Sequence, residues 1–279
     1  MAQLPVRGRG VRELELPLPP QRLPLLRRGR LLKRWRYVAV YTPELMLCVG
    51  DARIGPIPQR WWAVATPDGR LYERTSLGSA GLRLEGSRIR ADSRGVEIDL
   101  ELEESAGVEI VSPSGERDNY IWTRKQAGVP VRGRIAVDGR EHALDGPDAF
   151  VDDSAGYHRR HTVWKWSAGL GRARGGERVA WNFVAGVHDA DRESERTVWV
   201  DDEPVEIGPN TFADDLSWVG SDDGSRLEFS EWSTREASMN ALVLRNRYRQ
   251  PFGAFRGRLP GGLELAEGHG VMEEHDVWW

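Results

Sequence analysis

Residues that can transfer protons gather in three short stretches of the chain. Residues 152–166, DDSAGYHRRHTVWKW, combine two acids, two histidines, a tyrosine and two tryptophans in fifteen positions. Residues 181–200, WNFVAGVHDADRESERTVWV, and residues 265–279, LAEGHGVMEEHDVWW, hold further histidines beside acids. Five of the six histidines of the chain lie in these stretches, and histidine titrates near neutral pH. Burying such groups costs free energy unless they are paired, so each stretch is either a solvated surface strand or part of a pocket for acid–base chemistry.

In such a pocket the side chains would take different roles. His188 or His161 would carry the proton, and an acid would orient the histidine. Tryptophans would form the wall and stabilise a developing cation. The candidate catalytic residues are His161, His188, Asp189, Asp153 and His158, with Asp152 as an additional acid. The candidate ligand-binding residues are Tyr157, Trp164, Trp166, Asn182, Trp181 and Trp122.

Strand geometry separates the two histidines of the first stretch. Side chains alternate between the two faces of a β-strand, so residues an even number of positions apart share a face. If residues 157–166 form one strand, His158 lies on the face of Trp164 and Trp166, whereas His161 lies on the other face. This alternation favours His158 as the histidine of a pocket lined by the tryptophans.

Several other chemistries are not indicated. His158 and His161 would point to opposite sides of a strand, so this pair is not expected to bind a metal ion. Cys48 is the only cysteine, which excludes an internal disulfide and a cysteine-based metal cluster. The stretch GLGRARGG at residues 169–176 lacks the Lys-Ser/Thr pair of a phosphate-binding loop, and no Gly-x-Ser-x-Gly elbow is present. We expect neither a metal nor a cofactor.

The composition narrows the class of protein. The chain has 279 residues, a formal net charge of −4 and 39% hydrophobic residues, which is typical of a soluble protein. The mildly acidic balance argues against nucleic acid as a partner. No window approaches the roughly 18 apolar residues of a membrane span, and the N-terminus lacks a signal-peptide core. We therefore expect a cytoplasmic protein without an integral membrane segment, and composition leaves its oligomeric state open.

The hydrophobic pattern predicts strands through most of the chain. Val96, Ile98, Leu100 and Leu102 alternate with acidic residues, which is typical of a half-buried antiparallel strand. Residues 179–189, VAWNFVAGVHD, alternate in a similar way. The connections TPDGR, VDGRE, SDDGS and LPGGL favour tight hairpins, and strands recur about every 8–12 residues. The sequence predicts an all-β protein, either a lipocalin- or calycin-like antiparallel barrel or two β-sandwich or barrel lobes.

Domain boundaries are less clearly marked than the strands. Four prolines between residues 17 and 24 exclude a regular helix there, so residues 1–34 are expected to form an extended N-terminal arm. We expect a first β lobe at residues 35–147 and a second at residues 148–279, or one integrated domain. No internal repeat is visible. Residues 237–247, ASMNALVLRNR, are the best candidate for a helix, although a strand is preferred.

Several motifs together resemble a bacterial family known as domain of unknown function 2804. They are CVGDARIGPIPQRWWAV, TRKQAG, DDSAGYHRRHTVWKWSAG, WNFVAGVHD, SERTVWVDDEPVE and QPFGAFRGRLPGGLELAEGHGVMEEHDVWW. The resemblance runs from about Trp35 to Trp279. It implies membership of a family and does not by itself imply an activity.

A more distant resemblance is to the carotenoid hydratases (hydroxyneurosporene synthase) and their relatives, carried by GYHRRHTVW and GVHD. It implies lipocalin-like β lobes around an apolar cavity, where an acid protonates an isolated double bond and water adds. His161 and Trp164 would correspond to the family's His-x-Trp pair, and Asp189 to the acid of its Tyr-x-Asp pair. This chain departs from both motifs, because two residues separate His161 from Trp164 and Val187 replaces the tyrosine. The resemblance thus favours His161, whereas strand alternation favours His158.

Three functions fit these observations. The first is a cofactor-free hydratase, isomerase or cyclase that acts on a hydrophobic small molecule, such as an isoprenoid or a polyketide-like compound. The second is a non-catalytic protein of the same fold that binds a lipid or another small molecule. The third is a carbohydrate-active β-sandwich, because tryptophans and paired carboxylates also suit sugars. A cavity lined by tryptophans would favour the first two, and exposed coplanar tryptophans would favour the third.

Overall fold

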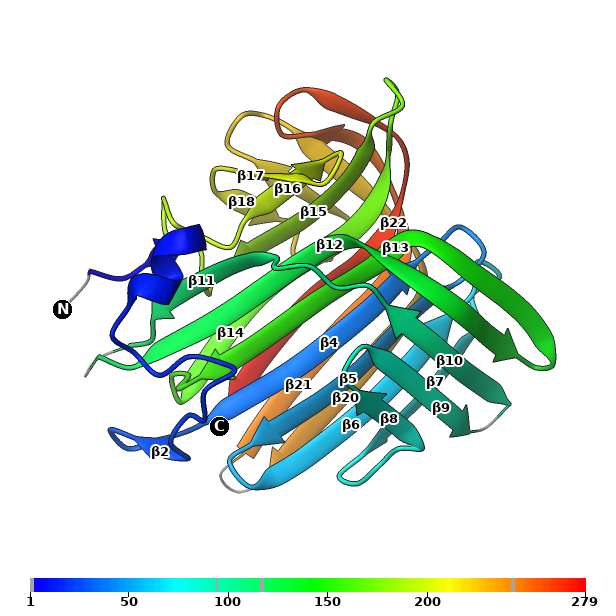
Figure 1. Ribbon diagram of the computed structural model, residues 1–279. Helices are drawn as coiled ribbons and strands as arrows, with labels where there is room; N and C mark the ends of the chain where they lie inside the picture. Colours follow the sequence, from blue (N-terminus) through cyan, green and yellow to red (C-terminus); the bar gives the residue numbers. More distant parts are fainter. Residues whose placement is uncertain (1–2, 94, 116–117, 242–243) are drawn as a thin grey trace.

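The computed structural model describes residues 3–93, 95–115, 118–241 and 244–279 (Figure 1). These residues form two large antiparallel sheets of eleven and nine strands, a two-stranded hairpin and one short 3-10 helix. Each large sheet curls into a half-barrel. The all-β prediction is confirmed, and of the architectures considered the chain adopts two half-barrel lobes.

The first sheet comes from the N-terminal part of the chain. Its strands follow the order β7-β6-β5-β4-β13-β12-β10-β9-β8, while β11 pairs with β12 and β1 pairs with β11. Its strands are β1 (Val6–Arg7), β4 (Lys33–Tyr41), β5 (Met46–Ile54), β6 (Ile57–Ala65), β7 (Leu71–Ser76), β8 (Leu82–Glu85), β9 (Arg88–Ser93), β10 (Val96–Leu102), β11 (Val108–Pro113), β12 (Tyr120–Val137) and β13 (Arg140–Gly156).

The second sheet comes from the C-terminal part of the chain, with the order β17-β16-β15-β14-β22-β21-β20-β19-β18. Its strands are β14 (His161–Ala173), β15 (Arg178–Ala185), β16 (Thr197–Val200), β17 (Glu203–Glu206), β18 (Asn210–Phe212), β19 (Trp218–Ser221), β20 (Arg226–Ala241), β21 (Leu244–Leu259) and β22 (Leu263–Trp278). The separate hairpin consists of β2 (Leu26–Arg27) and β3 (Arg30–Leu31).

The two sheets repeat one topology. Apart from β1 and β11, which lie off the main path of the first sheet, each sheet has four consecutive strands side by side in chain order, β4–β7 and β14–β17. The last strand of each sheet then pairs with the first of these four. Thus β13 pairs with β4 in the first sheet, and β22 pairs with β14 in the second. The chain passes from one sheet to the other between Gly156 and His161, beyond residue 147, where the sequence analysis places the lobe boundary. The repetition is visible in the strand order and not in the sequence.

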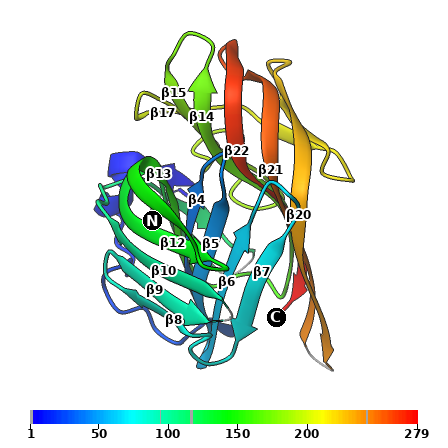
Figure 2. The same ribbon diagram turned by 90° about the vertical axis from the view of Figure 1, so that its right-hand side faces the viewer.

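Each sheet packs one face against an apolar core of its own and turns the other face toward its partner. Trp62 lies in the core of the first sheet, and Trp181 lies in the core of the second. A third cluster joins the two sheets and includes Phe150 from the first and Trp166 from the second. Figure 2 shows β20 beside β6 and β7, where the sheets also make contact. The protein therefore has two sheet cores and a third apolar layer between them.

The strands predicted most clearly from the sequence are present. Strand β10 buries Val96, Ile98, Leu100 and Leu102, as its alternation indicates. Strand β15 buries both of its faces, because one enters the core of the second sheet and the other faces the first sheet. Residues 238 and 240 of the helical candidate lie in strand β20, so the preferred strand is found there. Residues 242 and 243 lie outside the described residues.

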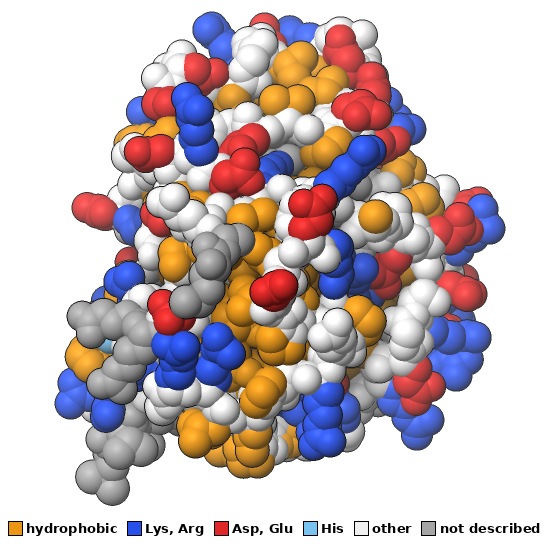
Figure 3. Space-filling model, turned by 60° about the vertical axis from the view of Figure 1, so that its left-hand side comes forward, with side chains coloured by type: hydrophobic (Ala, Val, Ile, Leu, Met, Phe, Trp, Pro, Cys, Tyr) orange, Lys and Arg blue, Asp and Glu red, His pale blue; other side chains and the backbone are white. Residues whose placement is uncertain are grey.

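The Pro-rich N-terminal segment packs against the first sheet. Residues 8–13, which precede the proline cluster, form a 3-10 helix, η1 (Gly8–Glu13), where an extended chain is expected. Val11 and Leu18 pack with Trp122 and Tyr157 in a fourth apolar cluster. Figure 3 shows hydrophobic side chains in the middle and lower part of one face of the molecule, among basic and acidic ones. The exposed large apolar side chains of the N-terminal segment include Leu25, Leu26 and Leu31.

Two glycines allow tryptophan rings to lie across a neighbouring strand. A Cβ at Gly169 would lie 2.1 Å from Cζ2 of Trp181 and 2.7 Å from the carbonyl oxygen of His269. A Cβ at Gly50 would lie 2.1 Å from Cζ2 of Trp61. Each glycine pairs directly with the tryptophan that it accommodates. Close packing of these rings therefore depends on the missing side chain.

Candidate functional site

A cavity of about 780 Å³ lies between the two sheets, and we refer to it as the intersheet cavity. Its walls come from β4–β7, β12 and β13 of the first sheet and from β14, β15 and β20–β22 of the second. This volume is in the usual range for a small-molecule site. The aromatic residues of its wall are Trp35, Tyr37, Trp61, Trp164, Trp166, Tyr248 and Trp279. Its charged or titratable residues include Lys33, Glu73, Lys125, Asp152, His158, His188, Glu195, Arg235, Glu273 and His275.

Glu273 presents a buried carboxyl group to the cavity from β22. Its Oε1 accepts a hydrogen bond from Nε1 of Trp164 at 2.8 Å, and its Oε2 accepts one from Nε2 of Gln250 at 2.9 Å. Burial raises the pKa of Glu273 to about 7, although hydrogen bonds from Trp164 and Tyr248 oppose this rise. Near neutral pH the carboxyl group therefore keeps its proton in a large fraction of molecules. Such a group is suited to general acid catalysis.

Lys125 lies between two buried carboxyl groups on the opposite wall. Its Nζ is 2.7 Å from Oδ1 of Asp152, its direct partner on β13, and 3.5 Å from Oε1 of Glu195. Oγ1 of Thr123 donates a hydrogen bond to Oε2 of Glu195 at 3.2 Å. Burial raises the pKa of Asp152 despite the attraction of Lys125. Burial lowers the pKa of Lys125, but attraction to both carboxylates outweighs burial and raises it. Because two carboxyl groups share a single ammonium group as their counter-charge, one of these acids is suited to accept a proton.

Three histidines of the cavity wall are neutral at physiological pH. Burial lowers the pKa of His188 to about 4 and the pKa of His275 to about 3. Burial also lowers the pKa of His158 well below its usual range, and the charge of Lys33 adds to this effect. Within the described residues, Nδ1 of His188 is buried and has no hydrogen-bond partner. These histidines can offer hydrogen bonds to a ligand, whereas the acid suited to neutral pH is Glu273.

Arg235 connects the second sheet to the first at the wall of the cavity. Its Nε lies 3.2 Å from Oε2 of Glu73, and its Nη2 donates a hydrogen bond to Oγ1 of Thr75 at 3.0 Å. The guanidinium carbon lies 5.6 Å from the ring centroid of Trp61 and 5.0 Å from that of Tyr248. This buried cation is therefore paired and packed between aromatic rings.

The structure brings five of the predicted site residues to the cavity: Asp152, His158, His188, Trp164 and Trp166. His158 belongs to the connection between β13 and β14, and its ring centroid lies 5.1 Å from that of Trp35. The structure thus places His158 with Trp164 and Trp166, as strand alternation predicts. Strand β14, however, begins only at His161, after His158.

His161 lies outside the cavity on the other face of β14. Its side chain is exposed, and its Nε2 lies 2.8 Å from Oδ1 of Asp276. Its ring stacks on that of Trp278 with the centroids 4.2 Å apart. The two histidines of the first stretch thus have different surroundings, and only His158 faces the tryptophan-lined space.

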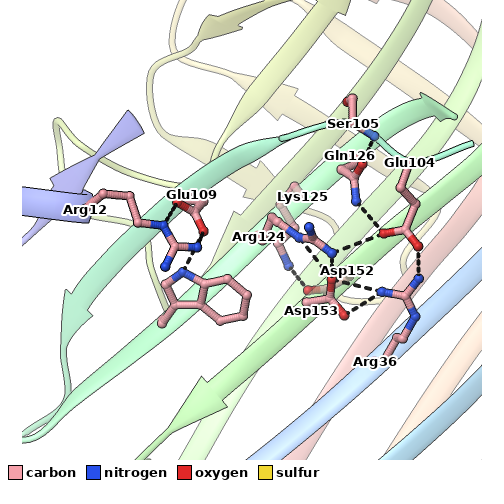
Figure 4. Close-up of polar contacts among 11 residues, drawn as sticks. Arg12, Arg36, Glu104, Ser105, Glu109, Arg124, Lys125, Gln126, Asp152 and Asp153 are labelled. Atoms are coloured by element: carbon pink, nitrogen blue, oxygen red, sulfur yellow. Dashed lines mark hydrogen bonds and ion pairs between the residues drawn. The ribbon is translucent and has the colours of Figure 1, made fainter. Parts of the chain in front are cut away.

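Two of the predicted acids also lie away from the cavity. Asp153 points to the opposite side of β13 from Asp152, where Figure 4 shows it in a network with Arg36, Arg124 and Glu104. Nη1 of Arg36 and Nε of Arg124 each lie 3.1 Å from a carboxylate oxygen of Asp153. Asp189 is exposed, and its Oδ2 accepts a hydrogen bond from the backbone N–H of Gly186 at 2.7 Å. Both side chains already have local structural partners.

The remaining predicted ligand-binding residues are buried elsewhere. Trp122 and Tyr157 pack under the N-terminal segment, and Trp181 lies in the core of the second sheet. Asn182 supports the cavity wall from behind, because its Oδ1 accepts a hydrogen bond from Nε1 of Trp166 at 2.8 Å. None of these four side chains is part of the cavity lining.

The structure also identifies functional candidates that sequence reasoning did not assign to the site: Glu273, Lys125, Glu195 and Tyr248. A signal for Glu273 existed, because Glu273, His275 and Val277 share one face of a strand. This signal is ambiguous, because the other face of the strand carries Glu274 and Asp276, whose side chains are also acidic. Only the pairing of β22 with β14 decides which face is inside.

Two kinds of feature are absent from the described residues. In this part of the chain, no helix is long and apolar enough to cross a membrane. Over the same residues, no group of three or more histidine, cysteine and acidic side chains is arranged to hold a metal ion.

Solved structures define the class of fold to which this protein belongs. A protein labelled AttH from Nitrosomonas europaea is similar with a TM-score of 0.56 at 13% identity, covering 92% of this chain and 97% of that chain. Kievitone hydratase from Nectria haematococca is similar with a TM-score of 0.51 at 13% identity, covering 87% of this chain and 88% of that chain. At this level of identity, the likeness shows a common lipocalin-like two-lobed fold.

The chain belongs to the family described as Domain of unknown function (DUF2804). The sequence model of that family matches residues 71–279, which confirms the family suggested by the motifs. No curated protein matches the chain in sequence.

Proposed function

We propose that this protein binds an apolar small molecule in the intersheet cavity and catalyses a cofactor-independent acid–base reaction on it. The reaction is a hydration, an isomerisation or a cyclisation, with Glu273 as proton donor and Asp152 as proton acceptor. The observation that carries the proposal is that two buried carboxyl groups with different partners face one cavity lined by tryptophans. Pairs of acids in contrasting environments commonly divide the roles of acid and base.

The surroundings of Glu273 suit it to donate a proton. Both of its oxygens accept hydrogen bonds from neutral N–H groups, and its carboxyl group is not paired with a lysine as Asp152 is. The negative charge of Asp152 also raises the pKa of Glu273. Asp152 would act as the base beside Lys125, with neutral His188 available to hydrogen-bond a water or a substrate hydroxyl group.

For a hydration, the steps balance without an oxidant or a reductant. A carbon–carbon double bond takes the proton of Glu273, and its π electrons form the new C–H bond. The adjacent carbon becomes cationic, and the faces of Trp164 and Trp166 stabilise the positive charge. Water adds to that carbon, and its extra proton passes to Asp152. In an isomerisation, Asp152 instead removes a proton from a neighbouring carbon.

Non-catalytic binding of an apolar molecule is the second candidate function. It needs the same cavity and the same aromatic wall, and it requires no division of roles between Glu273 and Asp152. The third function considered, action on carbohydrates, has less support, because Trp35, Trp164 and Trp166 line an internal space between two sheets.

A panel of isoprenoid and polyketide-like alkenes, incubated with the protein in water labelled with both heavy oxygen and deuterium, tests the proposal. The expected result is a product that carries labelled oxygen, or an isomer whose new C–H hydrogen comes from the solvent. Glu273→Gln should lower turnover by roughly 10²–10⁴-fold while ligand binding is retained. Glu274→Gln is the matched control, because Glu274 lies on the opposite face of the same strand and should retain turnover.

Native mass spectrometry distinguishes the second candidate function. If the protein purified from its host carries a ligand that stays unaltered, and Glu273→Gln binds it equally well without any effect on its chemistry, catalysis is excluded for that ligand. Failure of the whole alkene panel to bind would instead reject the cavity as an apolar binding site.

A further inference from the structure

Lys33 is a buried cation of the intersheet cavity that has no anionic partner among the described residues. It is the first residue of β4, is only 3% exposed and forms part of the cavity wall. Its Nζ lies 4.9 Å from the ring centroid of Trp279. In the described part of the chain, Lys33 makes neither an ion pair nor a side-chain hydrogen bond.

The other two buried cations of the cavity differ from Lys33 in this respect. Lys125 lies 2.7 Å from a carboxylate oxygen of Asp152, and Arg235 lies 3.2 Å from one of Glu73. Burial lowers the pKa of Lys33 to about 8, and repulsion from Arg30 adds to this effect. A partly desolvated ammonium without a counter-charge is costly, and an anion that binds beside it removes much of this cost.

We infer that the ligand of the intersheet cavity carries a carboxylate, which pairs with Lys33 while the apolar body of the ligand extends along the aromatic wall toward Glu273. This inference rests on the proposed function, because it adds the charge and the orientation of the molecule that the cavity binds. Trp35 and Trp279 flank His158 beside this end of the cavity. They provide apolar surface next to the ammonium.

The strand geometry gives the approximate length of such a ligand. Lys33 and Tyr37 lie four residues apart on β4, which is about 13 Å along the strand. Nε2 of Gln250 lies 3.5 Å from Oη of Tyr37 and 2.9 Å from Oε2 of Glu273, so Tyr37 marks the level of the proposed acid. A carboxylate bound at Lys33 would therefore place a reactive carbon on the order of 13 Å away beside Glu273.

Binding of three amphipathic probes of equal chain length tests this inference. Dodecanoate, dodecan-1-ol and dodecylamine are titrated into the protein, and binding is followed by tryptophan fluorescence and calorimetry. Dodecanoate should bind on the order of ten-fold more tightly than dodecan-1-ol, because a hydrogen bond to a charged group contributes this much. Dodecylamine should bind more weakly than the alcohol.

Variants of Lys33 show whether this residue is the source of the preference. Lys33→Met should bind dodecanoate and dodecan-1-ol about equally, and Lys33→Arg should retain the preference. Lys165→Met is the control, because Lys165 pairs with Asp214 outside the cavity and its loss should change neither affinity. Thermal unfolding of each variant confirms that the protein is folded before the affinities are compared.

The outcomes separate this inference from the proposed function. Equal binding of dodecanoate and dodecan-1-ol by the wild type, or a preference that persists in Lys33→Met, would overturn the carboxylate site and leave apolar binding intact. Absence of binding by all three probes would overturn both the carboxylate site and the proposed apolar site.

Discussion

Replacing Glu273 with glutamine should change the pH dependence of stability in a defined direction. The neutral amide resembles the protonated carboxyl group in shape, so Glu273→Gln removes the ionisation and keeps most of the packing. Its Oε1 can still accept the hydrogen bond from Trp164, and the amide of Gln250 can reorient toward the new side chain. The main energetic change is therefore that the variant no longer bears the free-energy cost of ionising a buried carboxyl group.

The magnitude follows from the two pKa values of Glu273. A glutamate in the unfolded chain titrates near 4.5, whereas Glu273 in the folded protein titrates at about 7. Between these pH values the folded state holds a proton that the unfolded state has lost, so stability falls as pH rises. At 1.36 kcal/mol per pH unit, the loss amounts to about 3 kcal/mol by the time both states are ionised. Below pH 4.5 both states are protonated, and this contribution vanishes.

Urea unfolding of the wild type and Glu273→Gln at about pH 5 and about pH 8.5 measures this effect. From the lower to the higher pH, the free energy of unfolding of the variant should rise by roughly 2–3 kcal/mol relative to that of the wild type. Glu274→Gln controls for replacing a carboxyl group with an amide on the same strand and should show a smaller relative change. A change of less than about 1 kcal/mol between the two pH values, in the difference in unfolding free energy between the wild type and Glu273→Gln, would show that the pKa of Glu273 is not raised to this extent.

Two further substitutions test other parts of the structure. Lys125→Met should lower the free energy of unfolding by about 3–5 kcal/mol, because the buried carboxylates of Asp152 and Glu195 lose their counter-charge. Urea unfolding checks this value; Asp152→Asn added to Lys125→Met should restore part of the stability, and a loss below about 1 kcal/mol would contradict the pairing. Gly169→Ala should cost about 1–3 kcal/mol, because the new Cβ would overlap the ring of Trp181. Thermal unfolding with near-UV circular dichroism monitors that ring, and an unchanged melting temperature would contradict the close packing.

The strands of this protein are predictable because their signal is local. Alternation in β10 reports directly that one of its faces is buried, and Asp-Gly turns mark where hairpins close. The same local rule separates His158 from His161. Residues 8–13 depart from the expected extended arm, because they contain no proline and the proline cluster begins only at Pro17.

The site is less predictable because it depends on how the two sheets face each other. Asp152 and Asp153 are adjacent in sequence, yet one faces the intersheet cavity and the other joins an arginine network outside it. Periodicity shows that they point in opposite directions, but it cannot show which direction is inward. Glu273 and Glu274 pose the same problem on β22. Burial, which makes Glu273 a candidate acid, arises only when both sheets are in place.

The common strand order of the two sheets is the arrangement that duplication of one half-barrel would produce. Asp152 lies on β13, the last strand of the first sheet, opposite Tyr37 of β4. Glu273 lies on the last strand of the second sheet, opposite Trp166 of its first strand. Each half thus contributes one acid from its last strand, and the neighbours of the two acids differ, with Lys125 beside Asp152 and Gln250 beside Glu273. If the two halves arose by duplication, the proposed division between proton donor and proton acceptor would be an asymmetry between two copies of one ancestral position.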